Sequence, residues 1–283
     1  MTIVESAMER AREIGNGVPP GPSVNLTPLQ RPAVTPLQPH GRIRPQVIRP
    51  NADECRESRL LMSATAEGDN GAVAAYRVLR TRLLHRIRAQ RWVTIGVTSA
   101  RPGDGKTTTV LNLAFSMARE KNSEVVLLDL DMRNPSVCKT LGVEPPRELR
   151  DFFERPSSPD NLFFSVGVDD LLIAGQIQAS TQASELLASS RFEDLLSHVQ
   201  QNTVNPIVLI DLPPLLSTDD ALVLAPRLDA LLLVVAEGRT DRSELERATE
   251  LLSEFRMAGI VMNCSTERGG RYDYDYGRPS YNR

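Results

Sequence analysis

Short runs of apolar residues recur along the last two thirds of the chain. Within each run the apolar positions do not alternate with polar ones, so each predicted strand must be covered on both faces, which is typical of a parallel sheet. The strands are predicted at 92–99, 124–131, 161–166, 170–175, 206–212, 230–237 and 259–264.

Segments with apolar residues at helical spacing separate these strands. The helices are predicted at 72–91, 106–119, 190–201, 218–225 and 242–257. Strands and helices that alternate in this way predict an α/β fold, a doubly wound and mostly parallel sheet with helices on both faces.

The two ends of the chain follow other patterns. Residues 1–15 have the spacing of a short amphipathic helix, which is marginal alone. The linker at 16–55 is rich in proline and arginine, and over 16–52 it holds nine of the 20 prolines with no acid and no aromatic residue. Such a composition predicts disorder. We therefore expect the folded domain at 56–266 and a flexible, tyrosine-rich tail at 267–283.

Composition narrows the function classes. The chain has 283 residues, 41% of them hydrophobic, and a net charge of −3, which gives no electrostatic basis for binding nucleic acid. No apolar run approaches the 18 residues of a membrane span, so we expect no direct membrane insertion. Three cysteines without CxxC spacing argue against disulfides or a zinc module and favour the cytoplasm.

A glycine-rich segment, ARPGDGKT at 100–107, lies between a predicted strand and a predicted helix. It matches the phosphate-binding P-loop except that Ala100 replaces the first glycine. Glycines let backbone N–H groups turn toward phosphates, the lysine reaches the β- and γ-phosphates, and the threonine hydroxyl can ligate Mg²⁺. The predicted nucleotide-binding residues are Gly103, Asp104, Gly105, Lys106, Thr107 and Thr108.

Three aspartates end two of the predicted strands. Asp129 and Asp131 occupy alternate positions and share a face, at the strand ends where α/β sheets bind ligands. Asp211, after four apolar residues in VLIDLPP, has the Walker B pattern and would complete a Mg²⁺ shell with Thr107. A solvated strand end is the alternative for the first pair, and a helix cap is the alternative for Asp211.

Tyrosine is concentrated at one end of the chain. Four of its five tyrosines fall in the last twelve residues, namely Tyr272, Tyr274, Tyr276 and Tyr281. The segment is too polar to pack, so it is either a low-complexity end or a cluster of phosphorylation substrates. Each phosphate would add about −1.5 to −2 charges.

The chain resembles the bacterial tyrosine kinases (BY-kinases) over residues 70–283. The resemblance lies in the tyrosine-rich tail and in three motifs, TSARPGDGKTT, VVLLDLDMRNPS and IVLIDLPP. The resemblance rests most on the Walker A′ form, here Asp129, Asp131 and Arg133. It implies an ATP-dependent protein-tyrosine kinase that phosphorylates its own C-terminal tyrosines and controls capsule or exopolysaccharide assembly.

The resemblance also implies roles for single residues. Lys106 and Thr107 would bind nucleotide and metal, and Asp131 and Asp211 would hold Mg²⁺. Asp129 would be the base for the tyrosine hydroxyl. A further position, Asn263, matches the asparagine that contacts adenine in related ATPases. The implied cofactors are ATP and Mg²⁺.

Without a fused membrane segment, the chain resembles the split members of the family, which a membrane-bound co-polymerase recruits and activates. Residues 1–55 would then be a tether that nucleotide binding does not need. The family's ring-forming helix carries Glu-x-x-Arg-x-x-Arg, of which Arg77 and Arg80 are present while Ala74 replaces the glutamate. We therefore expect a weak homo-oligomer.

Two other functions are open on the sequence. A ParA/MinD-type switch that dimerises on ATP would carry a lysine where Arg101 stands, and a MinD-like protein would also need a terminal amphipathic membrane helix, which the tail does not provide. An ATP-sensing scaffold of a polysaccharide export machine would need little turnover. Phosphate on the tail after incubation with ATP would separate the kinase from both.

Overall fold

A computed structural model of the protein describes residues 42–62, 70–155 and 157–265. The predicted helix at 1–15, the first part of the linker and the tail with its four tyrosines lie outside the described residues.

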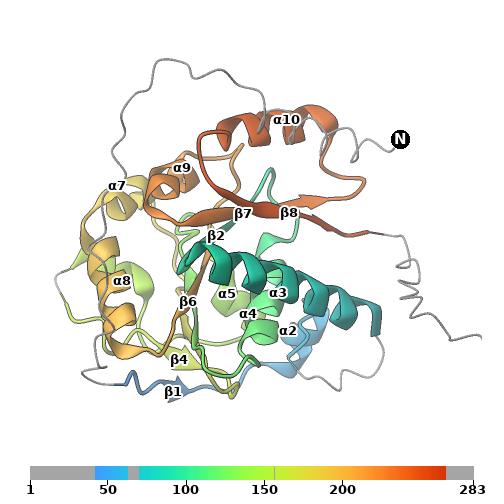
Figure 1. The fold of residues 1–283 in the computed structure, drawn as a ribbon. Helices are drawn as coiled ribbons and strands as arrows, with labels where there is room; N and C mark the ends of the chain where they lie inside the picture. Colours follow the sequence, from blue (N-terminus) through green and yellow to red (C-terminus); the bar gives the residue numbers. More distant parts are fainter. Residues whose placement is uncertain (1–41, 63–69, 156, 266–283) are drawn as a thin grey trace, which may run out of the picture. The chain divides into compact units, whose positions relative to one another are not determined.

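The core of the described chain is an eight-stranded sheet in the order β1-β4-β5-β3-β6-β2-β7-β8 (Figure 1). Every neighbouring pair is parallel except β4 with β5. The strands are β1 Gln46–Val47, β2 Thr94–Ser99, β3 Val125–Asp129, β4 Phe164–Ser165, β5 Leu171–Ala174, β6 Ile207–Asp211, β7 Ala230–Ala236 and β8 Met257–Asn263. The mostly parallel sheet confirms the predicted fold class.

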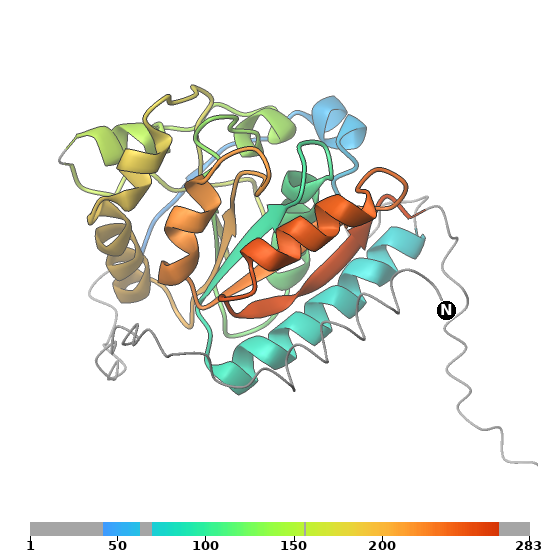
Figure 2. The same ribbon diagram turned by 90° about the horizontal axis from the view of Figure 1, so that it is seen from above.

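Helices lie on both faces of the sheet (Figure 2). Two clusters of buried apolar residues join the sheet to these helices. Helices α6 to α10 supply one cluster and helices α2 to α5 the other. The helices are α2 Ala52–Glu57, α3 Asn70–Gln90, α4 Lys106–Met117, α5 Val137–Leu141, α6 Leu149–Glu154, α7 Ala183–Ala188, α8 Arg191–Asn202, α9 Asp220–Leu224 and α10 Arg242–Leu251. Strands β2, β3, β6 and β7 are buried along their whole length, as their unbroken apolar runs require.

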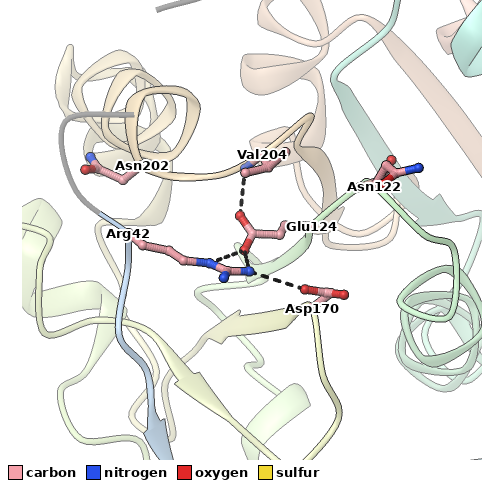
Figure 3. A pocket seen from close by; sticks show the side chains of 7 residues that line it. Arg42, Asn122, Glu124, Asp170, Asn202 and Val204 are labelled. Carbon is pink, nitrogen blue, oxygen red and sulfur yellow. Dashed lines mark hydrogen bonds and ion pairs between the residues drawn. The ribbon is translucent and has the colours of Figure 1, made fainter. Parts of the chain in front are cut away.

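Part of the predicted linker is ordered, which corrects its assignment to a disordered 16–55 segment. Residues 42–62, which we call the strap, lie along the edge of the sheet, where β1 pairs with β4. At its start, Arg42 lies in a polar pocket of about 420 Å³ (Figure 3). Its Nη2 is 2.8 Å from Oε1 of Glu124 and 3.6 Å from Oδ1 of Asp170.

The strap then crosses two helices of the domain. Its helix α2 is capped by Asn51, whose side chain accepts a hydrogen bond from Asp53 N. The N–H of Asn51 donates to the Leu141 carbonyl at the end of α5. Near its other end, Leu61 N donates to Oδ1 of Asn112 on α4 at 2.7 Å. The folded domain therefore begins by residue 42 instead of residue 56.

No helix within the described ranges is both long enough and apolar enough to cross a membrane.

Candidate active site

The P-loop is a tight turn between β2 and α4. Gly103 and Gly105 both have left-handed backbones, with φ of 86° and 85°, which residues with a Cβ adopt at a cost. Within the loop, the Asp104 carboxylate accepts a hydrogen bond from Arg101 N at 3.0 Å. The loop therefore leads into the N-terminus of a 12-residue helix, the place where backbone donors and the helix dipole favour phosphate.

Gly105 is also required because of what lies against it. A Cβ built at this position would overlap the Asn263 amide, whereas one built at Gly103 would meet nothing within 4 Å. Asn263, the last residue of β8, donates from Nδ2 to the Asp104 carbonyl at 2.9 Å. The structure thus brings the predicted adenine-contacting residue, Asn263, against the P-loop.

The lysine of the P-loop lies between two of the predicted carboxylates. Lys106 Nζ is 2.8 Å from Oδ2 of Asp131 and 3.2 Å from Oδ1 of Asp211. Thr107 Oγ1 donates to the other Asp211 oxygen at 2.6 Å. Burial opposes the charged lysine, but Asp211 and Asp131 raise the Lys106 pKa above its ordinary value. The lysine is therefore held as a cation at the end of the sheet.

Asp129 is fully buried in the site. Its Oδ2 accepts hydrogen bonds from Ser136 N at 3.0 Å and Val137 N at 2.9 Å. Burial and the neighbouring Asp211 carboxylate raise the pKa of Asp129 to about 8, against the opposing effect of Lys106. Burial also raises the Asp211 pKa. A carboxylate with a pKa near neutral is suited to take up a proton.

The donor set is compatible with Mg²⁺ bound together with phosphates. Asp129, Asp131 and Asp211 are each at most 2% exposed, and all three carboxylates favour the positive charge of Lys106. No closed metal cage of three or more His, Cys, Asp or Glu residues is present in the part of the chain that the structure describes. Mg²⁺ is usually bound by one or two carboxylates plus phosphates and water, and the Thr107 hydroxyl and the Asp211 carboxylate, which contact each other, are oxygen ligands of the required kind.

Ser136 was missed by sequence analysis. Its hydroxyl is 2.7 Å from Thr107 Oγ1, and its N–H donates to Asp129, so it links the P-loop to the loop after β3. Its place just before α5, in the run DMRNPS, was the only signal in the sequence.

The remaining predicted site residues are placed as follows. Thr108 lies half-buried in the first turn of α4. On α3, Arg77 is exposed, whereas Arg80 donates from Nη1 to the Ser116 carbonyl on α4 at 3.1 Å and so is engaged within its own chain. The four tail tyrosines lie beyond the described residues, so no contact of theirs with the site is described.

Arg101, which stands where ParA/MinD-type proteins have a lysine, has a partner in its own chain. Its Nη1 is 3.2 Å from Oε1 of Glu244 on α10. The other Glu244 oxygen, Oε2, accepts the backbone N–H of Asp241 in a capping box at the start of the same helix. The arginine is therefore paired with α10 of its own chain.

The fold and the site together define a P-loop NTPase. The defining features are a mostly parallel, doubly wound sheet, a glycine-rich turn that leads into a helix, and a buried cluster of one lysine and three carboxylates. Residues 91–270 match the ParA family model, described as NUBPL iron-transfer P-loop NTPase.

Named relatives narrow the class. The chain is 30% identical to the tyrosine-protein kinase CpsD of Streptococcus pneumoniae, over 60% of this chain and 74% of the relative. It is 29% identical to the tyrosine-protein kinase YwqD of Bacillus subtilis, over 66% of this chain and 79% of the relative. The chain therefore belongs to the ParA family of P-loop NTPases and, within it, to the bacterial protein-tyrosine kinases.

A solved structure agrees on the fold. The kinase domain of the Escherichia coli tyrosine kinase ETK superposes with a TM-score of 0.66, over 76% of this chain and 84% of that one. At 24% identity this likeness concerns the fold alone.

Proposed function

We propose that the protein uses Mg²⁺-ATP to phosphorylate its own C-terminal tyrosines. The observation that carries the proposal is the meeting of Lys106 and Thr107 with Asp131 and Asp211 at the end of the sheet. A P-loop lysine among buried carboxylates suits a phosphoryl transfer, in which positioning and charge do most of the catalytic work.

Each residue has a distinct task in this proposal. The P-loop backbone and Lys106 bind the phosphates of ATP. Thr107, Asp131 and Asp211 hold Mg²⁺, which when bound screens the charge of the transferred phosphoryl group. Asp129, whose pKa is raised to about 8 by burial and by Asp211, accepts the proton of the tyrosine hydroxyl, for which a base is useful because the pKa of tyrosine is about 10.

The contact of Arg101 favours this function over an ATP-driven dimerisation switch. A switch of the ParA/MinD type would need a basic side chain at this position that is free for nucleotide chemistry. Here the guanidinium pairs with Glu244 in the same chain. An ATP-sensing scaffold, by contrast, differs only in turnover, so phosphotyrosine measurement separates it from the kinase.

We infer the cellular role from the same proposal. A tail cluster with several phosphates would repel neighbouring tails, because each phosphate adds about −1.5 to −2 charges. Such a kinase could regulate polymerisation and export of capsule or exopolysaccharide from the cytoplasmic side. A membrane-bound co-polymerase would then recruit and activate it.

The central test is the substitution Lys106→Met. We expect phosphotyrosine on Tyr272, Tyr274, Tyr276 and Tyr281 to disappear, with a loss of at least about 1,000-fold, as mapped by mass spectrometry after incubation with ATP. The matched control is Lys121→Met, since Lys121 is exposed and outside the site. An unchanged phosphotyrosine signal in a folded Lys106→Met protein would refute the proposal.

We also propose weak self-association through α3. Arg77 is exposed on this helix, but Ala74 offers no acid to a neighbouring arginine. Ala74→Glu should therefore tighten the oligomer severalfold, since an exposed ion pair adds about 0.2–1 kcal/mol per contact. Sedimentation across a concentration series checks this, with Ala75→Glu, on a neighbouring exposed position, as the control. Equal association of all three proteins would contradict the assignment of this helix.

A further inference from the structure

Asp220 is a buried carboxylate outside the Lys106 cluster. It is fully buried at the start of α9, in the segment that leads on from Asp211. An isolated buried carboxylate is costly unless it is paired and hydrogen-bonded. Its partners therefore indicate what it holds in place.

Those partners belong to the loop after β3 and to α7. Arg133 forms a two-pronged contact, with Nε 2.7 Å from Oδ2 of Asp220 and Nη2 3.1 Å from Oδ1. Ser184 on α7 donates its hydroxyl to the same carboxylate and accepts from Arg133 Nη2 at 3.1 Å. The two-pronged geometry fixes the orientation of the guanidinium as well as its position.

Arg133 belongs to the loop that carries Asp131. This loop spans the residues between β3 and α5, and one end of it is fixed by the Ser136 and Val137 N–H groups on Asp129. Its middle is held by the Asp220–Arg133 contact. Asp131, two residues before Arg133, makes the 2.8 Å contact with Lys106. A shift of Arg133 would therefore move the carboxylate that faces the lysine.

We propose that Asp220 is a positioning residue for phosphoryl transfer, which clamps the loop through Arg133 and thereby sets Asp131 against Lys106. Asp220 is not one of the residues proposed to bind nucleotide or metal, and in this proposal it acts only through Arg133. The inference rests on the proposed function, because it assigns Asp131 to the Mg²⁺-nucleotide site.

The test is Asp220→Asn, which keeps the size of the side chain but removes its charge. We expect kcat for tail phosphorylation to fall on the order of 100-fold, the effect of a displacement of about 1 Å in a reacting group. The Mg²⁺ concentration for half-maximal activity should rise at least about fivefold, because Asp131 is a proposed ligand. KM for ATP should stay within about threefold, since the P-loop backbone is untouched.

A double-mutant cycle tests whether Asp220 acts through Arg133. Arg133→Lys cannot form the two-pronged contact. If Asp220 acts through Arg133, the double variant Arg133→Lys/Asp220→Asn should therefore be about as active as the less active of the two single variants. Ser184→Ala, a milder change on the same carboxylate, should lower kcat a few-fold and serves if Asp220→Asn does not fold. The control, Glu193→Gln, removes an ion pair with Arg227 in the same half of the domain and should change neither kcat nor the Mg²⁺ requirement.

Two outcomes would overturn the inference. A lower melting temperature with unchanged kcat and Mg²⁺ dependence would make Asp220 structural only. Fully additive losses in the double variant would mean that Arg133 acts on substrate directly. Either result leaves the proposed function standing as long as Lys106→Met abolishes phosphotyrosine, so failure of the two proposals is distinguishable.

Discussion

The nucleotide centre and the strap are two regions of one domain that differ in how the sequence encodes them. The nucleotide centre consists of residues whose chemistry is visible in the sequence, from Gly103 to Thr107 and the three aspartates. The first part of the strap, residues 42–55, falls in the segment that composition predicts to be a disordered linker, yet the strap pairs with β4, lies over α5 and contacts α4.

The difference has a physical origin. A phosphate site needs particular residue types at fixed spacing, because only glycine, lysine, threonine and aspartate supply the turn, the cation and the oxygen ligands. The strap needs only backbone groups at a sheet edge and a few side chains. One of its anchors, Arg42, depends on Glu124 and Asp170, which are distant in sequence. Composition over a window does not contain such long-range partners.

The largest effect that separates the two regions should come from Asp211→Asn. Asp211 contacts both Lys106 and Thr107, so phosphoryl transfer should fall about 100- to 1,000-fold. Because burial raises the Asp211 pKa, the fold disfavours its charged form, and the neutral amide should not lower the melting temperature.

The control for this prediction lies in the pocket of the strap. Asp170→Asn removes a carboxylate that is 42% exposed and contacts only the strap's Arg42 among the ion pairs described. It should leave activity within about twofold, because exposed ion pairs contribute little. A loss below about tenfold for Asp211→Asn would show that the wrong carboxylate has been assigned.

A smaller effect should distinguish the two glycines of the P-loop. Gly105→Ala and Gly103→Ala place a Cβ on nearly the same left-handed backbone, with φ of 85° and 86°, and share a cost of about 1–2 kcal/mol. Only the Cβ at Gly105 would overlap the Asn263 amide. Gly105→Ala should therefore weaken ATP binding roughly tenfold more than Gly103→Ala.

Titration with a fluorescent ATP analogue measures this difference. Equal losses would mean that the contact between Asn263 and the P-loop does not contribute to nucleotide binding.

How far the sequence predicts the molecule depends on where the partners of a residue lie. The long strands β2, β3, β6 and β7 were predicted because burial on both faces leaves an unbroken apolar run. The meeting of Lys106, Asp131 and Asp211 followed from P-loop and strand-end spacing. The clamp of Asp220 on Arg133 could not be predicted, because two residues 87 positions apart carry no local sign of pairing. Strand β1 was missed because two residues on an edge form no periodic pattern.

The last prediction uses two deletions to test where the folded domain begins, before or after the strap. Removing residues 1–41 stops before Arg42 and leaves every described contact of the strap in place. We expect ATP affinity and the melting temperature to be unchanged, within about threefold and a few degrees. Removing residues 1–62 takes away the whole strap, including buried Cys55 and half-buried Leu60 and Met62 of the apolar cluster around α4.

The longer deletion should lower the melting temperature by on the order of 10 °C, since several partly buried side chains contribute about 3–5 kcal/mol. It should also weaken ATP binding, because α2 packs on α5, whose first N–H group, from Val137, binds Asp129. Calorimetry and nucleotide titration of both proteins measure the two effects. If both deletions leave the melting temperature and the ATP affinity unchanged, the strap is a tether and not part of the domain. If only the longer deletion lowers them, the strap belongs to the catalytic domain.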